Sequence, residues 1–231
     1  MRRMLGGSTG VLDRVRTAVR RRRPPPPPAA FPGTSQYWEQ RYAEGGTSGA
    51  GSTGELARFK ADVLNDFVDR HGVRTVTELG CGDGQQLSLA RYPEYRGLDV
   101  SATAVDMCAR RFAGDHTKSF YRYDPRAFHD RAGLFRSDLA LSLDVVFHLV
   151  DDGDFDRYMR LLFACGTSFV CVYSSNKAED DPYDHVRHRA FADWVERECG
   201  GWRLLERVEN PLRGRDPAAV SDFFFYTPDR R

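Results

Sequence analysis

Three glycines at alternate positions (80, 82 and 84) follow a short apolar segment that ends at the acidic residue Glu78. Glycine has no Cβ atom, so the backbone can turn sharply at these positions and approach a ligand closely. A second acidic residue, Asp99, ends the next apolar segment. An α/β unit places a ribose-binding carboxylate at about this separation from the glycine turn. The glycines and the two acids together predict a site for a nucleotide-like cofactor.

The spacing of the glycines distinguishes between cofactors. The nicotinamide fingerprint Gly-x-Gly-x-x-Gly requires a glycine where this chain has Gln85. The spacing Glu-x-Gly-x-Gly-x-Gly instead resembles motif I of the class I S-adenosylmethionine (SAM) methyltransferases, with Asp99 as the second-strand acid of that family. A glycine turn that only packs a strand against a helix is the alternative.

The resemblance extends from Tyr37 to the C-terminus and implies SAM as the cofactor. Motif I would hold the methionine moiety, and Asp99 would accept hydrogen bonds from the ribose hydroxyls. Tyr123 and Asp124 fall where the family contacts adenine, although Tyr123 can equally be packing at the edge of the sheet. The implied cofactor-binding residues are Glu78, Gly80, Cys81, Gly82, Gly84, Asp99, Val100, Tyr123, Asp124 and Leu143, joined by Trp38 and Tyr42 from an upstream aromatic segment.

That aromatic segment, Tyr37 to Tyr42, is followed by a glycine- and serine-rich stretch over residues 45–52. The segment resembles the aromatic entry helix of many small-molecule methyltransferases, and an aromatic ring face attracts a sulfonium cation. The flexible stretch can then close as a lid over the cofactor or the acceptor. A flexible linker before the next helix is the alternative.

Asp144 and His148 are the predicted catalytic residues. Methyl transfer is an in-line displacement, so positioning of the acceptor supplies much of the acceleration. A hydroxyl acceptor also needs a base, because its pKa lies far above neutrality. His148 follows Asp144 by four residues at the end of the fourth predicted strand, and histidine titrates near neutral pH. An acid limb with a pKa near 6.5 is therefore expected, unless His148 makes only a local hydrogen bond.

Three further residues are predicted to bind the acceptor. On a helix, His185, His188 and Arg189 would share one face, at positions i, i+3 and i+4, and a helix is expected over residues 186–198. Such a group can bind a carboxylate, a phosphate or a sugar acid, and a solvated helix start is the alternative. No metal site is predicted, because the histidines and acids do not show a metal-ligand spacing.

Positioning these residues requires alternating strands and helices. The pattern predicts an α/β fold with a Rossmann-like doubly wound sheet of seven mostly parallel strands. A helix is expected to begin near Gln85, directly after the glycine turn. The last two strands have no helix between them, which predicts an antiparallel C-terminal hairpin. The strands are expected at residues 74–79, 95–100, 119–123, 138–144, 168–173, 202–208 and 222–226.

The chain divides into a leader, residues 1–36, and a methyltransferase domain, residues 37–231. The leader is basic and contains five consecutive prolines at positions 24–28, so it is either a disordered segment or a surface helix. A basic amphipathic helix can contact a membrane surface or a protein partner, or act as a targeting presequence.

Composition limits the function. The net charge of +1 gives no reason to expect a nucleic-acid partner, and no apolar run reaches the ~20 residues of a transmembrane segment. The five cysteines lack a C-x-x-C pair, which favours a cytoplasmic protein.

The leading hypothesis is O-methylation of a small-molecule or glycan acceptor. The alternatives are a protein or peptide methyltransferase and a non-catalytic SAM-binding partner subunit. A nucleic-acid amine methyltransferase is disfavoured, since the sequence after the fourth strand lacks the Asp/Asn-Pro-Pro-Tyr/Phe signature.

Overall fold

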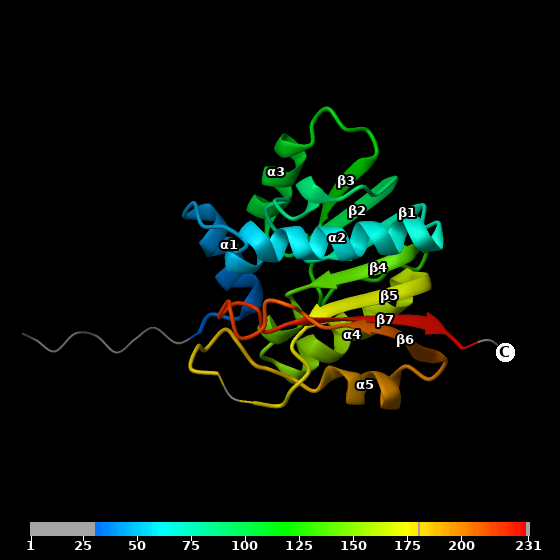
Figure 1. The fold of residues 1–231 in the computed structure, drawn as a ribbon. Coiled ribbons are helices and arrows are strands. Elements are labelled where there is room, and N and C mark those ends of the chain that lie inside the picture. Colours follow the sequence, from blue (N-terminus) through cyan, green and yellow to red (C-terminus); the bar gives the residue numbers. More distant parts are fainter. Residues whose placement is uncertain (1–30, 180, 230–231) are drawn as a thin grey trace, which may run out of the picture. The chain divides into compact units, whose positions relative to one another are not determined.

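A seven-stranded sheet with helices on both faces forms the core of the chain, and the computed structural model describes residues 31–179 and 181–229 (Figure 1). The strands lie in the order β3-β2-β1-β4-β5-β7-β6, and β7 alone runs in the opposite direction to the other six. The predicted α/β, Rossmann-like doubly wound fold with an antiparallel C-terminal hairpin is therefore confirmed. The strands are β1 (Thr75–Leu79), β2 (Glu94–Asp99), β3 (Lys118–Arg122), β4 (Ser137–Leu143), β5 (Gly166–Ser174), β6 (Trp202–Val208) and β7 (Asp222–Pro228).

Helices cover both faces of this sheet. Residues of α2 and α3 pack into one apolar cluster, and residues of α4 and α5 pack into a second cluster on the other face (Figure 1). No helix in the described part of the chain is long and apolar enough to cross a membrane. The helices are α1 (Thr34–Ala43), α2 (Gly54–His71), α3 (Ala102–Arg111), α4 (Asp152–Cys165) and α5 (Phe191–Glu198).

The predicted division between leader and domain falls inside α1, which already begins at Thr34. The predictions made for residues 1–30 lie outside the described residues. Phe31 and the residues after it form the unit that contains the sheet.

Two predicted helices differ from the structure. The helix expected from Gln85 is wrong: the chain forms only a 3₁₀ turn at Leu87–Leu89 before β2 begins. The stretch 85–93 is too short for a helix that must also return the chain to the start of the next parallel strand. The helix expected over 186–198 begins only at Phe191, because the side chains before it bond to other segments rather than lying along one helix face.

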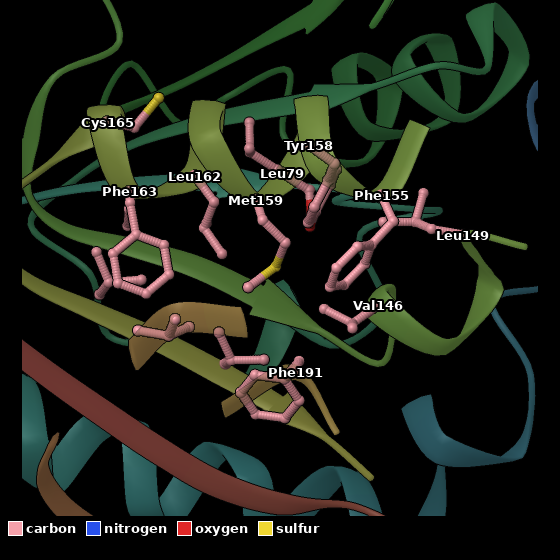
Figure 2. Packing of buried hydrophobic residues seen from close by; sticks show 14 of the residues in the cluster. Leu79, Val146, Leu149, Phe155, Tyr158, Met159, Leu162, Phe163, Cys165 and Phe191 are labelled. Atoms are coloured by element: carbon pink, nitrogen blue, oxygen red, sulfur yellow. The ribbon is translucent and has the colours of Figure 1, made fainter. Parts of the chain in front are cut away.

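Figure 2 shows how α4 is anchored to the sheet. Its apolar side chains point into a cluster that also receives Leu79 from β1 and Phe191 from α5. Leu162 lies in this cluster and is completely buried. Since β1 and β4 carry the predicted site at their ends, this packing sets where the site residues lie. The residues from α4 are Phe155, Tyr158, Met159, Leu162, Phe163 and Cys165.

Leu162→Ala is expected to lower the free energy of unfolding by about 2–5 kcal/mol, because it removes buried methyl groups and leaves a cavity. Urea denaturation measures the change. Leu134→Ala is the matched control, since Leu134 is 68% exposed and its truncation should leave stability within about 0.5 kcal/mol. Equal stabilities of the two variants would contradict the described packing of α4.

Candidate functional site

A cleft opens at the carboxyl ends of the central strands. Strand β1 lies between β2 and β4, so the strand order reverses there. Open α/β sheets bind their ligands at such a switch point. The cleft is lined by residues of the glycine turn, by the ends of β2 and β4 and by α1, among them Trp38, Tyr42, Ser48, Lys60, Glu78, Gly80, Cys81, Gly82, Gln86, Asp99, Val100, Tyr123, Leu143, Asp144 and His148.

The buried carboxylate of Asp99 is held by two backbone donors. Gly82 N–H donates to Oδ2 and Ser101 N–H donates to Oδ1, each at 2.9 Å. Burial raises the pKa of Asp99 to about 6, although these donors oppose the rise. At neutral pH the group is therefore mainly a carboxylate whose orientation is fixed. A fixed acceptor of this kind can bind a pair of ribose hydroxyls.

The other acid, Glu78, accepts a hydrogen bond of 2.6 Å from the hydroxyl of Tyr95. Burial raises the pKa of Glu78 to about 7, and the hydrogen bond from Tyr95 opposes this. Glu78 therefore exchanges a proton near neutral pH, and a positively charged ligand in the cleft would favour its ionised form.

The glycine turn is covered by the glycine- and serine-rich stretch. Ser48 N–H donates to Asp83 Oδ2, and Asp83 N–H donates to Ser48 Oγ, both at 3.1 Å. Gly82 has a φ of 57°, and a Cβ atom there would lie 2.3 Å from Ser48 Oγ. Only glycine fits this backbone and this contact. Ser48 and Asp83 were missed in the sequence, because their pairing joins segments far apart in the chain.

The predicted aromatic helix, α1, packs on the side of the cleft that holds His148. The rings of Trp38 and Tyr42 stack with centroids 5.7 Å apart, and Trp38 lies edge-on to His148 at 5.0 Å. Tyr37 stacks on His185 at 4.6 Å. Helix α1 therefore joins the cofactor residues to the predicted base.

His148 lies on the 3₁₀ turn Val146–His148 that follows β4. Its Nδ1 is 3.0 Å from the carbonyl oxygen of His185. Because a carbonyl only accepts, Nδ1 carries the hydrogen and Nε2 of the neutral ring has a free lone pair. Burial lowers the pKa of His148 to about 4, so the expectation of a value near 6.5 does not hold for this environment.

Asp144 has a left-handed backbone with a φ of 57°, the one such non-glycine residue in the described part of the chain. Its Oδ2 is 2.9 Å from Lys60 Nζ, and its Oδ1 accepts from Ser221 Oγ at 2.8 Å. Lys60 was missed in the sequence. The available signal was its place on α2, one helical turn from both Leu56 and Leu64, within the buried face of the helix.

The three predicted acceptor residues are not brought together. His185 stacks on His148, with ring centroids 5.5 Å apart, but it does not itself line the cleft. His188 Nδ1 instead lies 2.6 Å from Ser175 Oγ, and Arg189 donates to the carbonyl oxygens of Leu149 and Val150. Neither His188 nor Arg189 lines the cleft.

Only one of the two predicted adenine contacts, Tyr123 and Asp124, lies at the cleft. Tyr123 is buried and lines the cleft. Asp124 lies outside the cleft, and its carboxylate accepts from the backbone N–H of Arg126. This places Tyr123, and not Asp124, where a flat ring can pack beside Asp99.

Three comparisons relate the chain to known proteins. No protein-family model matches it. A small RNA 2′-O-methyltransferase of mouse (Mus musculus) is 25% identical over 166 residues, covering 64% of this chain and 42% of the mouse protein, so the chain spans less than half of that relative. The methyltransferase domain of bacterial CtHen1 matches with a TM-score of 0.60 at 18% identity, covering 74% of this chain and 97% of that domain. The N-methyltransferase NodS of Bradyrhizobium japonicum, in complex with S-adenosylhomocysteine, matches with a TM-score of 0.68 at 16% identity, covering 86% and 100%.

The chain therefore has the fold of the class I SAM-dependent methyltransferases, as the motif resemblance predicted. The cleft residues also fit SAM. Asp99 is a fixed acceptor, and Gly80 and Gly82 of the glycine turn line the cleft beside it. Gln86 Oε1, which lines the same cleft, is buried and finds no hydrogen-bond partner among the described residues. A buried acceptor without a donor is costly and suits a polar ligand.

Asp99→Asn is expected to weaken binding of S-adenosylhomocysteine about 10- to 100-fold, since the amide presents only one acceptor oxygen to hydroxyls and backbone donors. Calorimetry measures the affinity, and Asp106→Asn on the exposed face of α3 is the control. Wild-type affinity should also fall as the pH drops below about 6, because protonation removes the carboxylate. Unchanged affinity in Asp99→Asn would exclude this residue from the cofactor site.

Proposed function

We propose that this chain is an enzyme that transfers the methyl group of SAM to a hydroxyl of a small-molecule or glycan acceptor. The observation that supports it best is the unprotonated Nε2 of His148 at the cleft, fixed by the bond from Nδ1 to the carbonyl oxygen of His185. A histidine held in this tautomer can accept a proton from a hydroxyl. When bound, SAM supplies an electrophilic methyl group.

The residues of the cleft have different roles in this proposed reaction. Asp99 and the backbone of the glycine turn hold the nucleoside, and the ring of Trp38 packs in a T-shaped contact with His148. His148 takes the acceptor proton at Nε2. A pKa of about 4 suffices for this, because an oxygen that has gained a methyl group while keeping its proton is strongly acidic. The burial that lowers the pKa also keeps His148 neutral, and so ready to accept, throughout the physiological pH range. A cytoplasmic location stays a prediction.

A ribose hydroxyl of RNA is the second candidate acceptor, and it involves the same chemistry. The expectation of no nucleic-acid partner conflicts with the similarity to the mouse small RNA 2′-O-methyltransferase. That expectation rested on the net charge of +1, which says nothing about how the charges are distributed.

A groove beside the cleft supports the RNA candidate. Residues 123–136 connect β3 to β4 without an α-helix, and the groove lies between this segment and α4. Pro125 lines both the groove and the cleft. Of the arginines that line the groove, Arg131 and Arg136 make no ion pair within the described part of the chain. The other three groove arginines form ion pairs with Asp154, Asp156 or Glu198. The arginines that line the groove are Arg126, Arg131, Arg136, Arg157 and Arg160.

The function is tested with His148→Gln, because glutamine keeps a polar side chain but is not an efficient base. Turnover should fall about 10²- to 10⁴-fold while S-adenosylhomocysteine affinity stays unchanged. Methyl transfer to a panel of glycosides, nucleosides and RNA oligonucleotides is followed by mass spectrometry, and His116→Gln is the exposed control. With SAM and acceptor both saturating, the wild-type rate should be flat from pH 5.5 to 7.5. An acid limb centred near 6.5 that survives in His148→Gln would assign the proton to another group.

The acceptor class is tested with the double variant Arg131→Ala/Arg136→Ala. For RNA, the KM should rise at least about tenfold at low salt, and the salt dependence of binding should become shallower, because two phosphate contacts are lost. Transfer to an uncharged glycoside should be unaffected. Arg58→Ala/Arg203→Ala, which changes the same charge elsewhere, is the matched control. If glycosides are methylated and RNA is not, the small-molecule or glycan acceptor is retained.

A further inference from the structure

Lys60, Asp144 and Gln86 line one part of the cleft but come from three different segments of the chain. Lys60 lies on α2, Asp144 follows β4, and Gln86 follows the glycine turn. Lys60 is also the only lysine or arginine among the residues that line the cleft. The proposed catalytic steps leave all three residues without a role.

The ion pair between Lys60 and Asp144 is built into the fold. The lysine side chain is only 1% exposed, and its Nζ lies 2.9 Å from Asp144 Oδ2 and 5.3 Å from the ring centre of Tyr173. A buried charge is costly unless it is paired. The ammonium has three N–H donors, and Asp144 is its one hydrogen-bond acceptor among the described residues. Lys60 therefore keeps donors for a ligand.

Asp144 is held in a strained position beside this lysine. Its left-handed backbone is sparsely populated for residues other than glycine, and such strain gathers at functional sites. The bond from Ser221 Oγ fixes the second carboxylate oxygen. A Cβ atom on Gly51 would lie 2.8 Å from Asp144 Oδ2, so the glycine- and serine-rich stretch packs directly on the ion pair.

Gln86 adds an unused acceptor. Its Nε2 donates to the carbonyl oxygen of Ala57 at 3.1 Å, one turn before Lys60 on α2. This bond fixes the amide, so its orphaned Oε1 is the oxygen atom that needs a donor. The three side chains thus offer one cation and two acceptors, in a cleft whose other charged lining residues are the acids Glu78, Asp83, Asp99 and Asp154.

We propose that these three residues bind the α-amino-acid end of SAM. Lys60 binds the carboxylate, while Asp144 and Gln86 Oε1 accept from the ammonium group. An α-amino acid carries both charges on one carbon, and the ion pair presents the two opposite charges 2.9 Å apart. Asp99 ends β2 and Asp144 follows β4, and these two strands flank β1. A ligand whose ribose lies at Asp99 therefore crosses the glycine turn after β1 to reach the ion pair of Lys60 and Asp144. The inference rests on the proposed SAM-dependent function and moves Asp144 from catalysis to cofactor binding.

Two probes isolate this subsite in calorimetry. S-Adenosylhomocysteine carries the amino-acid end, and 5′-methylthioadenosine has the same nucleoside without it. Lys60→Met should weaken S-adenosylhomocysteine about 10- to 100-fold and leave 5′-methylthioadenosine unchanged, because one charge-assisted hydrogen bond is lost. Asp144→Asn and Gln86→Met should show the same selectivity, whereas Asp99→Asn should weaken both probes. Lys177→Met, at an exposed lysine, is the matched control.

Retained binding of 5′-methylthioadenosine shows in the same experiment that each variant is folded. An unchanged S-adenosylhomocysteine affinity in Lys60→Met would overturn the inference and assign the lysine to the acceptor or to stability. Equal weakening of both probes would also overturn it, since Lys60 would then only support the fold. Failure of the wild-type protein to bind either probe would instead contradict the proposed function itself.

Discussion

The carboxylate of Asp99 joins the parts of the molecule that have to meet at the cleft. It accepts from Gly82 N–H of the glycine turn and from Ser101 N–H at the start of α3. Ser101 in turn caps α3 through Ala104 N–H and donates to Glu39 of α1 at 2.7 Å. One network thus positions the end of β2, the turn after β1 and two helices. The burial that makes this network rigid also raises the pKa of Asp99, so cofactor binding and local order depend on the same charge.

The charges of the cleft suit a ligand that is itself cationic at one point and zwitterionic at another. Burial raises the pKa values of Glu78 and Asp99, which shows that both carboxylates lack full compensation. A sulfonium in the cleft would compensate them, because an opposite charge favours the ionised form. Lys60 is balanced by Asp144 in advance, so the cleft does not hold an unpaired buried cation before the ligand binds. The ion pair with Asp144 therefore lowers the free-energy cost of burying the Lys60 cation in the cleft.

Most of the fold could be predicted from the sequence, since strands such as β4 and β7 are short apolar runs with their own turn signals. The apolar face of α2 and the glycine turn were likewise readable, because their causes are local. The stretch after Gln85 was misread, since its length, rather than its composition, decides against a helix. His188 and Arg189 were misplaced for another reason: their partners, Ser175 and Leu149, are not neighbours in the sequence.

The site shows the same difference between features with local causes and features that depend on contacts between distant segments. The cofactor half lies on strand ends and tight turns, where the backbone geometry dictates residue types such as Gly82, so a pattern in the sequence identifies it. The part around His148 is built from groups that meet only after folding: Tyr37 on α1 stacks on His185, and the backbone carbonyl oxygen of His185 orients His148. Loops carried by a rigid scaffold vary in this way, and they set specificity. The position of the glycine turn is therefore set by the sheet, whereas the surroundings of His148 depend on how α1 and the segment around His185 pack together.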